Sequence, residues 1–276
     1  YKRQVLFRFY EIPQRDRADS ISINTNTQSA VKARDLRSNS KQILKLKKAY
    51  EAKYSNGFFA TKRGEIIPAD KDKQYCIELS YLGKNLTAWY MQRPNLSYGE
   101  TKIFDKYFNT LFKNDYLPED AYALSFWMRK IMDAWTQENP LGLEEELLTM
   151  KAYAPYHLLF AISMVFAKCN NQTNVPSPSE CLKVASENNL VDSIINIAAN
   201  CLNSAISAEK NNCEQNNKSF IPQNWVKNKS CNAGIMSAIQ NYFSFLPTMN
   251  KEMDSKLKNG VKIDSKYFSY RVQAED

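Results

Sequence analysis

The spacing of apolar and polar positions predicts several helices and a few short strands. Residues 5–10 are rich in β-branched and aromatic side chains and precede Pro13, which is typical of a strand. After the polar run at residues 38–40, apolar residues recur at helical spacing, and we expect a helix that ends at Asn56-Gly57. Residues 58–61 are then expected to form a second strand.

Beyond residue 76 the pattern is almost entirely helical. Pro155 should divide one long apolar segment into two helical pieces, because proline removes a backbone donor. Ser177 and Glu180 have the spacing of a capping box at the start of another helix. We expect residues 211–219 to form a polar loop and the polar tail over residues 251–276 to be partly loose. The predicted helices cover residues 77–91, 100–113, 118–137, 143–169 in two pieces, 191–210 and 226–245.

This distribution predicts an α+β fold that is mainly α. The chain has 7 glycines in 276 residues, which disfavours an all-β architecture rich in tight turns. We expect a small mixed strand and helix segment over residues 1–115, forming the C-terminal part of a larger domain. A helical domain over residues 116–276 should follow it.

The positive charge of the chain is concentrated in its first part. Residues 1–115 contain 22 Lys and Arg against 12 Asp and Glu, a net charge of +10, whereas residues 116–276 carry a net charge of −2. A basic field attracts polyanions, of which nucleic acid is the commonest in a cell. A solvated basic surface without a partner would have the same composition.

Recognisable catalytic and metal-binding motifs are missing from the sequence. The only histidine, His157, lies in an apolar segment, where a packing role is expected. The six cysteines form no C-x-x-C pair, and no glycine-rich phosphate loop occurs. We therefore predict no catalytic residues, no metal ligands and no cofactor, and we expect the cysteines to be reduced thiols in a cytoplasmic protein.

The most informative polar stretch is the run of amides and hydroxyls at residues 24–28. Such neutral groups suit recognition of sugars, base edges or phosphates, and basic residues follow them closely. Another basic pair comes after the strand at residues 58–61. Both segments could equally be a self-capped loop and a solvated hairpin tip. The candidate binding residues are Asn24, Asn26, Gln28, Lys32, Arg34, Arg37, Lys62 and Arg63.

Three segments of the chain, in the order in which they occur, resemble motifs of the AIPR (abortive infection phage resistance) family. They are TNTQSAV at residues 25–31, DLRS at residues 35–38, and Arg93-Pro94 followed by IFDKYFNTLF at residues 103–112. The resemblance covers roughly residues 5–120 and implies a role in phage defence. Because the family's upstream N-G-x-Q-T segment is absent, we expect a fragment lacking its N-terminal part. A looser similarity to ParB-like proteins with a DGQHR motif implies nucleotide or DNA binding.

These observations favour a non-catalytic module that binds or senses a nucleic acid or nucleotide. Two other hypotheses stay open: a scaffold that binds a partner protein or a second copy of the chain, and a metal-dependent nuclease. No apolar run reaches the roughly 18 residues that would cross a bilayer, so no membrane partner is expected.

Overall fold

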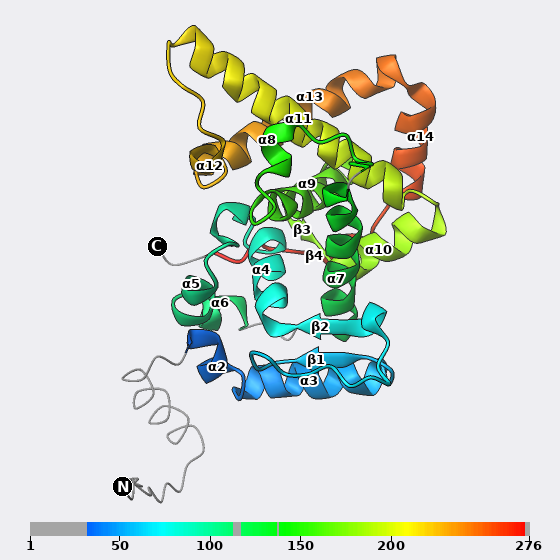
Figure 1. Ribbon diagram of the computed structural model, residues 1–276. Helices are drawn as coiled ribbons and strands as arrows, with labels where there is room; N and C mark the ends of the chain where they lie inside the picture. The colour runs from blue at the N-terminus through cyan, green and yellow to red at the C-terminus, as the bar shows by residue number, and fades with distance from the viewer. Residues whose placement is uncertain (1–31, 113–116, 137, 274–276) are drawn as a thin grey trace, which may run out of the picture.

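The computed structural model describes residues 32–112, 117–136 and 138–273, and this part of the chain is mainly helical (Figure 1). The prediction of an α+β, mainly α fold is confirmed. The longer helices are α3 (Lys41–Lys53), α4 (Leu79–Trp89), α7 (Pro118–Met132), α9 (Ala154–Cys169), α10 (Pro178–Glu187), α11 (Val191–Gln215), α13 (Lys229–Met249) and α14 (Lys251–Gly260). The shorter ones are α2 (Ala33–Arg37), α5 (Glu100–Asp105), α6 (Phe108–Leu111), α8 (Glu145–Leu148) and α12 (Pro222–Trp225).

Four short strands form two separate two-stranded sheets. The strand β1 (Phe58–Ala60) pairs in parallel with β2 (Cys76–Glu78), and β3 (Val175–Pro176) pairs antiparallel with β4 (Phe268–Ser269). The first sheet lies between α3 on one side and α4 and α7 on the other (Figure 1). The predicted strand at residues 5–10 lies outside the described residues.

Helix α9 is the centre of the hydrophobic core. Nearly all its residues are buried, as expected for a helix that is apolar on every face. Four helices, α4, α7, α11 and α13, pack against it. The predicted division of residues 143–169 into two helical pieces is confirmed, because α8 and α9 are separate helices. Pro155 stands in the first turn of α9, where the missing N–H costs no hydrogen bond.

The division into two segments near residue 115 stays a prediction. Helix α7, which follows that point, packs against α3 and α4, which precede it. One cluster of buried side chains extends from Ile43 in α3 to Val261 after α14. The described parts on the two sides of residue 115 therefore share a core.

Two local expectations were wrong. The predicted helix at 100–113 is divided into α5 and α6, because the Lys106 and Tyr107 N–H groups both bond to the Lys102 carbonyl oxygen, at 2.9 and 3.0 Å, and close the first helix. Helix α11 continues to Gln215 through most of the predicted loop. The tail after residue 250, which was expected to be partly loose, contains α14 and β4. Among the described residues, no helix combines the length and apolarity that crossing a membrane requires.

Candidate functional site

Arg34, one of the predicted binding residues, is buried and occupied by acidic partners. Its guanidinium pairs with the Asp35 carboxylate at 3.1 Å and with the Glu100 carboxylate at 3.4 Å. The second contact joins α2 to α5. The structure therefore gives this side chain a clear role in holding the two helices together.

Arg37 also contacts the protein, whereas Lys32 is exposed. The Arg37 Nε donates a hydrogen bond to the Phe104 carbonyl oxygen at 3.2 Å, and its guanidinium lies 4.8 Å from the centre of the Phe108 ring. That geometry is a cation–π contact. Lys32 stands at the N-cap of α2 and is open to solvent.

The predicted basic turn after β1 is brought next to α2 through Asp35. The Asp35 carboxylate, already paired with Arg34, accepts a hydrogen bond from the Arg63 backbone N–H at 3.3 Å. Glu65 accepts from the backbone N–H groups of Thr61 and Lys62 at 2.8 and 3.1 Å, and these bonds lower the pKa of its carboxyl. The side chains of Lys62 and Arg63 are exposed.

The predicted amide residues Asn24, Asn26 and Gln28 lie outside the described residues. Their convergence with the basic side chains on one face therefore stays a prediction. What the structure brings together is the helix α2 and the turn at residues 62–64, with exposed cations at Lys32, Lys62 and Arg63.

A second basic surface, which sequence reasoning did not predict, lies between the C-terminal end of α4, the start of α13 and the C-terminal segment. We call it the basic cleft; its volume is about 510 Å³. Three of its lining residues are cationic, and none of its lining residues among those that the structure describes is acidic. They are Gln92, Arg93, Phe160, Lys229, Asn232, Ala233, Met236, Arg271 and Gln273.

The backbone around the basic cleft fixes two of its cations. Gln92 has a φ of 52°, in the sparsely populated left-handed region, and this turn ends α4 just before Arg93. The Arg271 Nε donates to the Met91 carbonyl oxygen at 2.9 Å, and the neighbouring Val272 N–H bonds to the Tyr90 carbonyl oxygen at 3.0 Å. The C-terminal segment is thus attached to the end of α4.

The electrostatics of the basic cleft favour an anion. Burial and then the charge of Arg93 lower the pKa of Arg271, as expected where two guanidinium groups face one region. Lys229 is the first residue of α13, and Asn232 and Ala233 belong to the same first turns. The N-terminus of a helix carries a partial positive charge from its aligned peptide dipoles, which adds to the field of the side chains.

Sequence reasoning missed this cleft because its cations are far apart along the chain. Lys229 and Arg271 belong to the second part of the chain, whose net charge is −2 and which seemed unsuited to a polyanion. Arg93 was noticed only as part of a family motif. The net charge of a sequence segment does not show which of its cations become neighbours when the chain folds.

His157 and the cysteines are packing residues. His157 is fully buried, its Nδ1 lies 3.1 Å from the Tyr153 carbonyl oxygen, and burial lowers its pKa to about 4. The six cysteines are free thiols, and burial raises the pKa of Cys169 and of Cys201 to about 12. Within the described ranges, no three His, Cys, Asp or Glu side chains come close enough to hold a metal ion.

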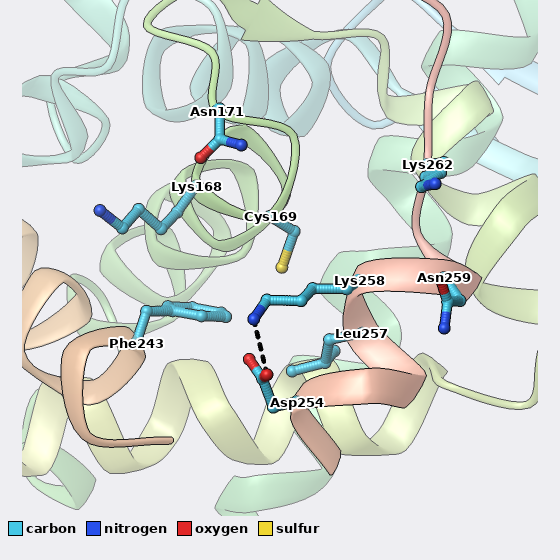
Figure 2. A pocket seen from close by; sticks show the side chains of 9 residues that line it. All are labelled: Lys168, Cys169, Asn171, Phe243, Asp254, Leu257, Lys258, Asn259 and Lys262. Atoms are coloured by element: carbon cyan, nitrogen blue, oxygen red, sulfur yellow. Dashed lines mark hydrogen bonds and ion pairs between the residues drawn. The ribbon is translucent and has the colours of Figure 1, made fainter. Parts of the chain in front are cut away.

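A second hollow, shown in Figure 2, lies between α9, α13 and α14 and contains Cys169. Its volume is about 340 Å³. The Lys258 Nζ is paired with the Asp254 carboxylate at 2.6 Å, which partly neutralises this pocket. The neutral thiol of Cys169 is a poor nucleophile, because the thiolate is the reactive form.

Fold and site together define a mainly helical protein with a concave cationic surface and a buried, unreactive histidine. A sequence model described as AIPR protein matches residues 2–218, and the chain belongs to this family of abortive-infection, phage-resistance proteins. No curated protein and no solved structure matches the chain. The matched range includes Arg93 but ends before Lys229 and Arg271.

Proposed function

We propose that this AIPR protein serves phage defence as a non-catalytic module that binds the phosphates of a nucleic acid or nucleotide in the basic cleft. The observation that carries the proposal is the gathering of Arg93, Lys229 and Arg271 around one hollow whose described lining contains no acidic residue. Arginine offers a planar fork of donors that matches phosphate oxygens, and lysine adds a mobile point charge.

The exposed cations at α2 and the turn after β1 form the second part of this proposal. Lys32, Lys62 and Arg63 would contact further phosphates, and the amides of Asn24, Asn26 and Gln28 would contact sugars or bases. Arg34 and Arg37 would act indirectly by holding α2 in place. We place the activity in the cytoplasm, which the free cysteines support.

Fluorescence anisotropy with labelled single-stranded RNA, single-stranded DNA and duplex DNA tests the proposal, with ATP as a competitor. We expect binding that weakens steeply with salt, because each phosphate contact releases counterions. The double variant Lys229→Ala/Arg271→Ala should bind about tenfold more weakly, a loss of about 1.4 kcal/mol. Its slope of log affinity against log salt should fall by about 1.4–1.8, since two phosphate contacts are removed.

The matched control is Lys218→Ala, an exposed lysine in the loop after α11 that lines neither of the two hollows described above. It removes one positive charge without touching the cleft and should leave the affinity unchanged. Arg63→Ala tests the second surface in the same titration. Binding that ignores salt, or a double variant with the affinity of the unaltered chain, would contradict the proposal for the cleft.

A further inference from the structure

A third hollow, mostly apolar and separate from the basic cleft, lies under the first sheet. We call it the sheet cavity; its volume is about 590 Å³, and it shares no lining residue with the basic cleft. Its walls come from β2, from one face of α4 and from one face of α7. The apolar lining consists of Ile67, Ile77, Tyr81, Leu82, Ala121, Met128 and Met132.

The spacing of residues along α4 and α7 brings polar side chains into this apolar lining. Leu82 and Asn85 are three residues apart on α4, and Ser125 and Arg129 are four apart on α7, so each pair shares a helix face. Because α4 and α7 pack against each other, the two faces meet across the cavity.

Asn85 is an unusual member of this lining. Its side chain is 3% exposed, yet its Oδ1 has no hydrogen-bond partner in the described structure. A buried amide oxygen without a partner costs roughly 1–3 kcal/mol, so it is rarely left in a packed interior. A ligand with an N–H or O–H group would satisfy it.

Arg129 offers the complementary group. Its Nη1 donates to the Ser125 Oγ at 2.7 Å, while its Nη2 is buried and has no partner in the described structure. The Arg129 guanidinium also lies 5.8 Å from the centre of the Tyr122 ring. The cavity lining also contains Lys73, Glu78 and Asp133, and Arg129 is the cation in it with a buried, unused donor.

We infer that the sheet cavity binds a small organic acid with an apolar, ring-sized body, an anionic oxygen for Arg129 and a hydrogen-bond donor for Asn85. Ligand sites of this kind are mostly apolar with a few placed polar groups, and volumes of roughly 300–1,000 Å³ are usual. The inference goes beyond the proposed phosphate binding and does not depend on it. All the lining residues lie inside the range that matches the family.

Two fluorescent probes test this inference directly. 8-Anilinonaphthalene-1-sulfonate has an apolar body, an N–H donor and an anionic group, and N-phenyl-1-naphthylamine is the same skeleton without the sulfonate. We expect the purified chain to bind the sulfonate probe saturably, with one molecule per chain. Arg129→Met should weaken the sulfonate probe about tenfold or more and change the neutral probe by less than about threefold.

Asn85→Leu distinguishes the second contact. It should weaken both probes, because both carry the N–H group that would meet the Asn85 oxygen. The matched control is Phe245→Ser, which removes an exposed apolar side chain far along the chain on α13 and should change neither probe. Circular dichroism confirms that each variant is folded, and Arg129→Gln replaces Arg129→Met if the latter does not fold.

Three results would overturn the inference. Binding that does not saturate at one probe per chain indicates adsorption to exposed apolar surface. Equal weakening of both probes by Arg129→Met indicates loss of packing instead of loss of a charge contact. Unchanged binding of both probes by the Asn85 and Arg129 variants places the probe elsewhere.

Discussion

His157 is the only histidine of the chain, and because it is buried, the stability of the fold depends on its protonation. Its pKa is lowered from 6.5 to about 4, first because burial disfavours the charged ring. Between these values the unfolded chain binds a proton that the folded chain does not. Stability should therefore be complete above about pH 6.5 and decline as the pH falls toward 4.

We predict a loss of about 2 kcal/mol in the free energy of unfolding between pH 7 and pH 5 from this residue alone. Urea unfolding at the two pH values measures it. His157→Asn keeps a donor near the Tyr153 carbonyl oxygen but does not titrate, so the difference between pH 7 and pH 5 should shrink by that amount. An unchanged pH dependence in the variant would show that other groups cause the decline.

At the scale of elements, the contact between α2 and α5 depends on one cation. Arg34 joins Asp35 on its own helix to Glu100 at the start of α5, and Asp35 also holds the turn at residues 62–64. Arg34→Ala should lower the free energy of unfolding by about 1–3 kcal/mol, since it leaves partly buried carboxylates without their partner.

Lys32→Ala is the control for this prediction. It removes an exposed cation at the N-cap of the same short helix, and it should change stability by no more than about 0.5 kcal/mol. Urea unfolding at neutral pH compares the two variants. If Arg34→Ala is as stable as Lys32→Ala, the ion pair contributes as little as a surface pair does.

At the scale of the whole molecule, the C-terminal segment connects distant parts of the fold. The Ser177 N–H bonds to the Tyr267 carbonyl oxygen at 2.8 Å, beside the pairing of β3 with β4. A few residues later, Arg271 and Val272 bond to the end of α4. The segment thus contacts both the region after α9 and the wall of the basic cleft.

Deleting residues 265–276 should lower the free energy of unfolding by roughly 3 kcal/mol, at about 1 kcal/mol for each of these three hydrogen bonds. It should also reduce nucleic-acid binding as much as Arg271→Ala does. Thermal and urea unfolding, with anisotropy on the same samples, measure both effects. Tyr270→Ala, at an exposed position in the same segment, is the control and should alter neither. Unchanged binding after the deletion would remove Arg271 from the proposed site.

The sequence by itself determined the helical character of the chain, most of its helices and its family. Apolar periodicity, the position of Pro155 and the capping serine Ser177 are local signals, because a helix is stabilised within a few residues of each position. The Ser177 side chain indeed accepts from the Glu180 N–H. The short strand β2 gave no such signal, since it needs a distant partner strand to form.

Only the tertiary structure decided which polar groups share a site. Lys229 and Arg271 meet Arg93 because the C-terminal segment returns to the end of α4, and Asn85 meets Arg129 because two helices pack face to face. Conversely, Arg34 is paired with the Glu100 carboxylate, which no local pattern relates to it. Charge and hydrogen bonding act through distances in space, and these distances exist only after the chain has folded around its core.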